Sequence, residues 1–164
     1  MNFFGYFAVY CIGLIFQFSL AKYLSIFGLF PNIILLMLLY IGLKKGSMTG
    51  QIMGFAWGIS WDVLSVGLFG SHSFLYACVG FFSGKLSRKW DESKVVTQVV
   101  IAGIASAIFL LGKDFIYSIF GDIDFGGGIN YISVFQIFYN MLLVPFIFKI
   151  GEKFNRKKAV KKYL

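Results

Sequence analysis

Charged side chains are scarce in this chain, and their scarcity excludes an ordinary water-soluble domain. Asp, Glu, Lys and Arg together make up 13% of the 164 residues, whereas soluble domains carry about a quarter. Hydrophobic residues reach 59%, and the mean hydropathy is +0.80. Such values are typical of a protein that crosses a membrane several times, and the length predicts one domain.

Cysteine and histidine are nearly absent, which excludes the sites that depend on them. The two cysteines, Cys11 and Cys78, lie in separate apolar runs, and neither a Cys-x-x-Cys nor a Cys/His spacing occurs. The single histidine, His72, cannot form a metal centre alone, because such a centre usually takes three or four protein ligands. We therefore expect no disulfide framework, no metal and no cofactor.

Six apolar segments predict an all-α polytopic membrane protein with about six transmembrane helices. A span needs about 20 apolar residues. The candidates are residues 2–21, 31–43, 50–68, 71–86, 95–119 and 131–148. Because the first segment lacks a basic start and a small-residue cleavage site, we interpret it as a retained span and not as a signal peptide.

The second segment is the shortest of the six. It opens with Pro31 and, at 1.5 Å per residue, residues 31–43 reach about 20 Å, which is less than the ~30 Å apolar core of a bilayer. The segment either continues backwards through the proline, with a break there, or it stays short or re-enters the membrane from one face. A proline suits the first turn of a helix, where its missing N–H is not needed.

The basic residues are concentrated at one predicted face of the membrane. Seven of the 15 Lys and Arg residues lie within 149–164, and further clusters follow the second and fourth segments. Because cytoplasmic loops are rich in Lys and Arg, the C-terminus is predicted to be cytoplasmic. With six spans the N-terminus is cytoplasmic too, whereas a re-entrant second segment would place it outside.

The basic C-terminus is expected to contact the membrane surface. We divide the chain into a single transmembrane helical domain, residues 1–150, and a basic cytoplasmic tail, residues 151–164. A basic residue near anionic lipid contributes about 1 kcal/mol of attraction. The membrane thus explains the net charge of +8, and we expect no nucleic acid as a partner.

A stripe of small residues runs along the third segment and ends in an acid. Gly50, Gly54, Gly58 and Asp62 are four residues apart, so on a helix they lie along one slowly turning face. Within a membrane, small residues at this spacing allow the backbones of two helices to approach closely. We interpret the stripe as a packing seam inside the protein, with a seat for a partner or ligand as the alternative.

Asp62 is a carboxylate within an apolar run, where burial costs about 2.5–3.5 kcal/mol on insertion scales. We expect it to be buried and to be paired with His72, with Lys113 or with Tyr or Ser hydroxyl groups. A catalytic Ser60–Asp62–His72 arrangement is disfavoured, because residues two apart on a helix point to different faces. The chain is therefore not expected to be an enzyme.

One pattern of positions runs through residues 31–84. An apolar segment led by proline ends in basic residues and glycine, then a G-F-x-x-G-x-x-x-D-x-x-S run follows, and then a turn that contains glycine. The positions are Pro31, Lys44, Lys45, Gly46, Gly54, Phe55, Gly58, Asp62, Ser65, Gly67 and Gly70. In this pattern, in its size and in its basic tail, the chain resembles the rod shape-determining protein MreD family.

The resemblance implies a non-catalytic component of the bacterial cell-elongation machinery in the cytoplasmic (inner) membrane. Members of the family partner with MreC, a single-span protein with an extracytoplasmic domain. Together they connect MreB filaments to the RodA glycosyltransferase and its penicillin-binding transpeptidase. The resemblance also implies a fold similar to the S subunits of energy-coupling-factor vitamin transporters.

That implied fold sets the alternative function, which is a substrate-binding S subunit of such a transporter. An S subunit would need a polar pocket near the outer side, and Asp62, His72 and Lys113 could line one. Such subunits often carry alanines spaced by four on the first span, whereas AVYCIGLIF contains no A-x-x-x-A.

Overall fold

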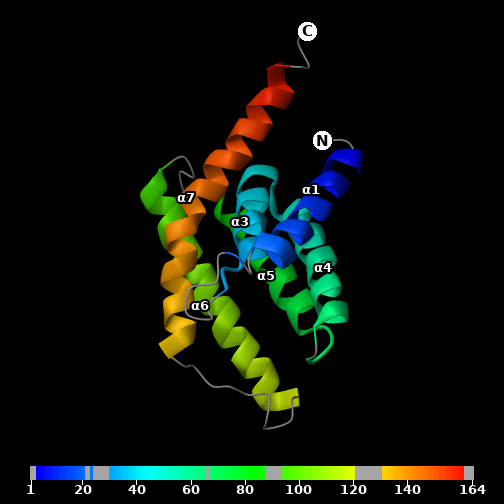
Figure 1. Ribbon diagram of the computed structural model, residues 1–164, viewed down its shortest axis with the longest axis vertical. Helices are drawn as coiled ribbons and strands as arrows, with labels where there is room; N and C mark the ends of the chain where they lie inside the picture. The colour runs from blue at the N-terminus through cyan, green and yellow to red at the C-terminus, as the bar shows by residue number, and fades with distance from the viewer. Residues whose placement is uncertain are drawn as a thin grey trace.

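The computed structural model describes residues 3–20, 23, 30–65, 67–87, 94–120 and 131–160, and these form an all-helical bundle (Figure 1). The elements in chain order are α1 (Phe3–Ile15), η1 (Phe16–Leu20), α3 (Ile33–Lys45), α4 (Ser47–Leu64), α5 (Ser71–Leu86), α6 (Val95–Phe120) and α7 (Tyr131–Val160). The element η1 is a π-helical turn that continues α1. The prediction of an all-α fold is confirmed.

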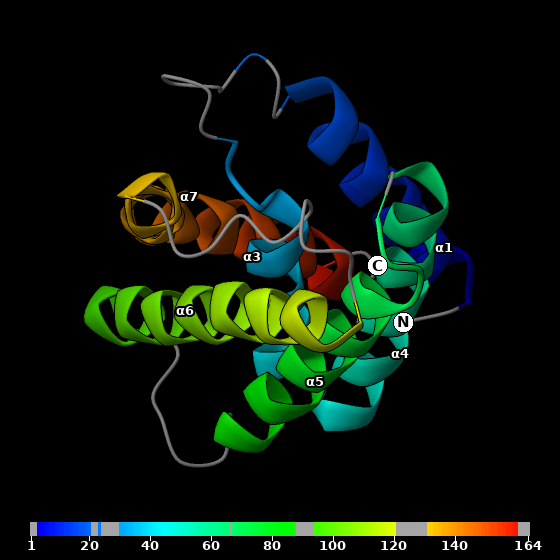
Figure 2. The same cartoon turned by 90° about the horizontal axis from the view of Figure 1, so that it is seen from below.

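Helix α3 lies at the centre of the bundle, with α4 and α5 on one side and α6 and α7 on the other (Figure 2). It contacts each of the other helices. Because its residues are apolar all round, burial on every side is the favourable arrangement. Its buried residues are Ile33, Ile34, Leu35, Leu36, Leu38, Leu39, Ile41, Gly42 and Leu43.

Helix α3 begins two residues after the proline that opens the predicted second segment. Pro31 and Asn32 precede it, and the Asn32 side chain caps the helix by accepting a hydrogen bond from Leu35 N at 3.0 Å. With 13 residues it is about 20 Å long, so it is too short to cross a bilayer by itself. Its N-terminal end therefore lies within the bundle, and the preceding backbone is buried there.

The other helices follow the predicted segments with shifted ends. Helix α4 begins at Ser47, directly after Gly46, and ends at Leu64, before the predicted end at residue 68. Helix α7 continues past residue 148 to Val160, so it includes most of the predicted basic tail. The division into a domain and a tail remains a prediction.

The surface of the bundle is apolar, as expected for a protein surrounded by lipid. Large hydrophobic side chains are more than half exposed on every α-helix except α3, for example Phe4, Ile52, Phe82, Phe115 and Leu142. Within the described ranges, Val95–Phe120 and Val134–Lys153 are long and apolar enough to cross a membrane, and Phe4–Ser19 is a shorter apolar helix. These features support a helical membrane protein.

Candidate functional site

The Asp62 carboxylate, near the end of α4, binds the first turn of α5. Its Oδ1 accepts hydrogen bonds from His72 N at 3.1 Å and from His72 Nδ1 at 2.9 Å. Its Oδ2 accepts from Ser73 N at 2.9 Å and from Ser73 Oγ at 2.5 Å. The side chain of Asp62 is completely buried, and its two oxygens thus have four donors.

This carboxylate caps a helix to which it does not belong. The first N–H groups of a helix have no partner within it, and a side-chain oxygen normally satisfies one or two of them. The capping residue of α5 is Gly70, which has no side chain that could do so. Asp62 supplies the acceptors from α4, and its negative charge is favourable at the N-terminus of a helix.

The structure brings two of the predicted partners, His72 and a serine hydroxyl group (Ser73), against Asp62, but it places Lys113 and Ser60 elsewhere. Lys113 lies on α6 and lines the pocket described below. Ser60 lies on another face of α4, where its hydroxyl binds that of Tyr10 on α1. The three residues of a Ser60–Asp62–His72 arrangement are thus not assembled.

The glycines of α4 face α5 at close range. A Cβ atom at Gly54 would overlap with the backbone of Tyr76, and one at Gly58 would overlap with the backbone of Ser73. Gly50 is likewise placed so that a Cβ atom would overlap with the backbone of α5. Since neighbouring backbones cannot move as a flexible side chain can, these positions have no room for any larger residue. The stripe on α4 ends at Asp62, and Asp62 binds the first turn of α5, the helix that the glycines contact.

Two glycines of α5 complete this contact from the other side. A Cβ atom at Gly80 would overlap with the backbone of Gly50, and one at Gly84 would overlap with the backbone of Ser47. They are four residues apart, as are the glycines of α4, so the same spacing could have revealed them. They are absent from the predicted seam, which was defined by the stripe that ends in an acid.

Two glycines of the pattern in residues 31–84 lie at turns between helices. Gly46 between α3 and α4 has φ of 92°, and Gly70 before α5 has φ of 95°. A Cβ atom at either position would meet no other atom, so space is not the constraint there. Residues with a side chain rarely adopt this left-handed region, which explains glycine at both turns.

The remaining positions of the pattern have different surroundings. Pro31 and Ser65 line the pocket, and Gly67 lies close to the hydroxyl group of Tyr117. Phe55 is on the outer face of α4 and is 53% exposed, so it is open to lipid or to a partner.

A network of side-chain amides surrounds the N-terminal end of α3. Asn32 Oδ1 accepts hydrogen bonds from Leu35 N and, at 2.9 Å, from Tyr76 OH on α5. Asn32 N donates to Asn140 Oδ1 on α7 at 3.0 Å, and Asn140 Nδ2 donates to Ser106 Oγ on α6 at 3.0 Å. Non-helical backbone is tolerated at membrane depth only where protein groups satisfy it. The network meets that requirement.

Two glutamines provide further hydrogen-bond partners for the backbone around the start of α3. Gln17 on η1 accepts from Ile34 N at 3.1 Å and donates to Pro31 O at 3.2 Å. Gln136 on α7 donates to Phe30 O at 2.9 Å. These amides were not among the predicted site residues. Isolated Asn and Gln residues inside apolar segments were the available signal, because such groups hydrogen-bond across helices in membranes.

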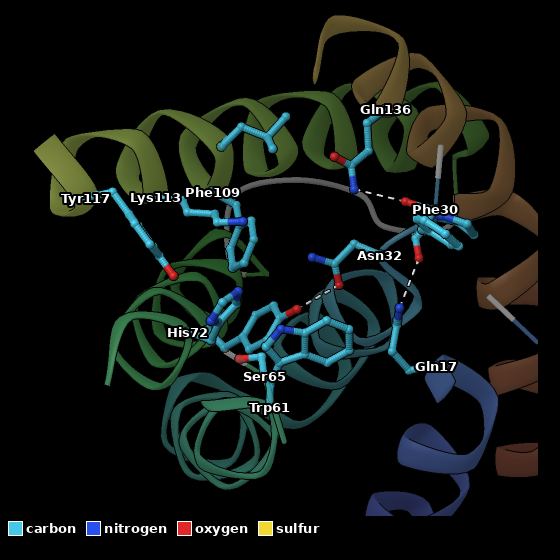
Figure 3. A pocket seen from close by; sticks show the side chains of 13 residues that line it. Gln17, Phe30, Asn32, Trp61, Ser65, His72, Phe109, Lys113, Tyr117 and Gln136 are labelled. Carbon is cyan, nitrogen blue, oxygen red and sulfur yellow. Dashed lines mark hydrogen bonds between the residues drawn. The ribbon is translucent and has the colours of Figure 1, made fainter. Parts of the chain in front are cut away.

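A pocket of about 200 Å³ lies beside this network (Figure 3). Asn32, His72, Lys113 and Tyr117 contribute polar groups to its lining, and Trp61 contributes an aromatic wall. These side chains come from four segments, which are the start of α3 and helices α4, α5 and α6, and Gln17 and Gln136 add η1 and α7. The pocket therefore forms only when the whole bundle has assembled.

We expect Tyr76→Phe to lower the free energy of unfolding by about 1 kcal/mol. The change removes one donor to Asn32 Oδ1, while Leu35 N continues to bind that oxygen. Thermal unfolding of the purified protein in detergent measures the effect. Tyr6→Phe is the control, because the Tyr6 hydroxyl takes part in none of the hydrogen bonds seen among the described residues. Equal melting temperatures for the two variants would contradict this account of the network.

Comparison with known families gives one result. The family model described as rod shape-determining protein MreD matches residues 1–154. Neither the curated proteins nor the solved structures contain a match to this chain. The family match covers the central helix, the α4–α5 contact and all of the residues that line the pocket.

Proposed function

This chain belongs to the MreD family of rod shape-determining proteins, and on that basis we propose that it is a non-catalytic scaffold of the bacterial cell-elongation complex. Membership implies a role in the determination of rod shape, and the apolar helices agree with a location in the membrane. The proposed direct partner is an MreC-type membrane protein. MreB filaments, the RodA glycosyltransferase and a penicillin-binding transpeptidase would be connected through it.

We propose that the protein crosses the cytoplasmic (inner) membrane several times with both termini in the cytoplasm. The start of α1, the α3–α4 turn and the end of α7 lie at the same end of the bundle (Figure 1). Lys44 Nζ lies 3.6 Å from Glu152 Oε1, which joins the end of α3 to the basic part of α7. The positive-inside tendency favours a cytoplasmic position for this end. The pocket then faces the other side.

The close packing of α4 and α5 is compatible with the scaffold role. Its glycine seam is occupied by the protein's own helices, so a partner would bind other surfaces. An MreC-type protein has one transmembrane helix and an extracytoplasmic domain. The first could pack on the exposed apolar faces of α4 and α5, which include Phe55 and Phe74, and the second could reach the pocket end. The match over residues 1–154 is the observation that carries this proposal.

A second candidate function is the substrate-binding S subunit of an energy-coupling-factor vitamin transporter. The polar pocket at the end opposite to the basic part of α7 is the observation that favours it. An S subunit would have to associate with an ATPase-linked coupling subunit, whereas the scaffold would associate with an MreC-type protein. The two functions therefore differ in the partner that co-purifies.

We expect the tagged protein, extracted in detergent from its own cells, to co-purify with an MreC-type protein. Mass spectrometry of the eluate identifies the partner, and an untagged strain is the control. Deletion of the gene should convert rods into rounded cells, and the wild-type gene should restore the rods. Intact rod shape after deletion, with no MreC-type protein in the eluate, would refute the scaffold. A coupling subunit in the eluate would favour the transporter.

A further inference from the structure

We propose that the pocket binds a small anionic group that carries a neighbouring hydroxyl group, as in glycerol phosphate. The pocket lies between the N-terminal end of α3 and helices α4, α5 and α6, with Gln17 and Gln136 at its edge. The proposal goes beyond the scaffold role and does not depend on it. It is based on polar atoms that face the pocket without using all of their hydrogen-bonding capacity.

Three donors face the pocket. The Lys113 ammonium group lies 5.7 Å from the centre of the Tyr117 ring, and none of the ion pairs among the described residues includes it. Asn32 uses its Oδ1 in the network, whereas its Nδ2 takes part in no hydrogen bond of the described chain and is directed into the pocket (Figure 3). Tyr117 OH accepts from Leu68 N at 3.2 Å, which leaves its proton available. A cation within a membrane protein usually pairs with a charge. An anionic ligand would meet that need.

His72 adds an acceptor to these donors. A carboxylate can only accept, so the His72 Nδ1 that lies 2.9 Å from Asp62 carries the proton. In the neutral ring, Nε2 then presents a lone pair, and Figure 3 shows the ring at the wall of the pocket. A hydroxyl group on the ligand can donate to this atom. A bare anion would leave the His72 acceptor unused, and a neutral alcohol would leave Lys113 unpaired.

The charge of Asp62 is partly balanced by the groups that bind it. Its side chain is fully buried, lies outside the lining and is bound by four donors. Lys113 is the charged residue of the pocket lining, so positive charge predominates at the pocket wall.

The size and walls of the pocket indicate a small ligand. Its volume of about 200 Å³ is below the ~300–1,000 Å³ of pockets for drug-sized molecules. Trp61 and Phe109 lie beside His72, with ring centres 5.9 and 6.0 Å from that of the imidazole. These rings can contact a three-carbon chain. The same chemistry occurs in free sn-glycerol 3-phosphate and in the headgroup of phosphatidylglycerol.

The test uses the full-length protein, purified in detergent and placed in nanodiscs of phosphatidylcholine alone. Tryptophan fluorescence, to which Trp61 contributes from the pocket wall, is titrated with sn-glycerol 3-phosphate, inorganic phosphate and glycerol. In the lipid arm, nanodiscs that contain phosphatidylglycerol and phosphatidylcholine at about 1:4 are examined by native mass spectrometry for retained phosphatidylglycerol. Saturable binding of glycerol phosphate that exceeds both other titrants supports a free ligand, and selective retention supports the lipid.

Lys113→Gln should weaken binding in the successful arm by about tenfold or more, because hydrogen bonds to charged groups contribute about 1.5–3 kcal/mol. Lys94→Gln is the matched control, since Lys94 is exposed just before α6, at the end opposite to Lys113. The affinity of this variant for the ligand should differ from that of the wild type by less than about twofold. Tyr117→Phe provides a second pocket variant and should also weaken binding. Melting temperatures verify that each variant is folded.

The proposal is overturned if neither arm shows saturable or selective binding. It is also overturned if folded Lys113→Gln and Tyr117→Phe proteins bind as the wild type does. Co-purification of the MreC-type partner is measured with the same variants. If the pocket variants lose ligand binding but retain the partner, the result supports the pocket proposal separately from the scaffold role. If the wild-type protein retains its partner but binds no ligand, the pocket proposal is refuted and the scaffold role is unaffected.

Discussion

Asp62→Ala is expected to destabilise the bundle by about 3–5 kcal/mol and to abolish rod-shape function. The variant leaves the donors of His72 and Ser73 without their acceptor in a buried place. Removal of one partner from a buried charged arrangement typically costs this amount, which is a large part of the ~5–15 kcal/mol stability of a domain. Thermal unfolding in detergent measures the stability, and complementation of a deletion strain measures the function.

Two variants serve as controls for this prediction. Asp62→Asn retains one carbonyl oxygen as an acceptor, so we expect a smaller loss than for alanine. Asp114→Ala removes a partly exposed acid on α6, towards the same end of the bundle, and we expect wild-type stability. A folded Asp62→Ala protein with a wild-type melting temperature and full complementation would show that the acid is dispensable.

Gly54→Ala is expected to destabilise the protein by about 1–3 kcal/mol or more, because the added methyl group overlaps with the backbone of α5 at Tyr76. Alanine is favoured over glycine within a helix by about 1 kcal/mol, so the measured loss is what remains after that gain. The overlap can be relieved only if α4 and α5 separate. Separation would also draw Asp62 away from the start of α5.

Gly103→Ala on α6 is the matched control. Its Cβ atom would meet the Sδ atom of Met141 at 2.9 Å, at the end of a flexible side chain that can rotate away. We therefore expect this variant to be as stable as the wild type or slightly more stable. Denaturant or thermal unfolding of both variants provides the comparison. Equal stability of Gly54→Ala and Gly103→Ala would contradict a close α4–α5 contact.

Much of the helical arrangement could be predicted from the sequence. Hydropathy alone located all six apolar segments, because a helix in lipid must be apolar along its length. The spacing of Gly50, Gly54 and Gly58 placed them on one face, because the period of a helix is a local property. The same rule indicated that Ser60 and Asp62 would point in different directions.

The start of α3 and its surroundings were less predictable. The proline indicated a break near residue 31, but not the amide network that makes the break possible inside the bundle. Asn32 and Asn140 are 108 residues apart in the chain, so their hydrogen bond has no local signature. Likewise, the choice of His72 and not Lys113 as the neighbour of Asp62 depends on how α5 and α6 pack.

The sequence by itself determined the helical composition, the apolar surface, the gathering of basic residues at the C-terminal end and the resemblance to MreD. Each of these follows from the composition of a segment or from the spacing of residues that are close in the chain. Only the tertiary structure decided that Asp62 caps α5, that glycines of α4 and α5 meet backbone to backbone, and that Asn32, His72 and Lys113 face one pocket. Those outcomes require segments far apart in the chain to be packed at hydrogen-bonding distance, which no local pattern specifies.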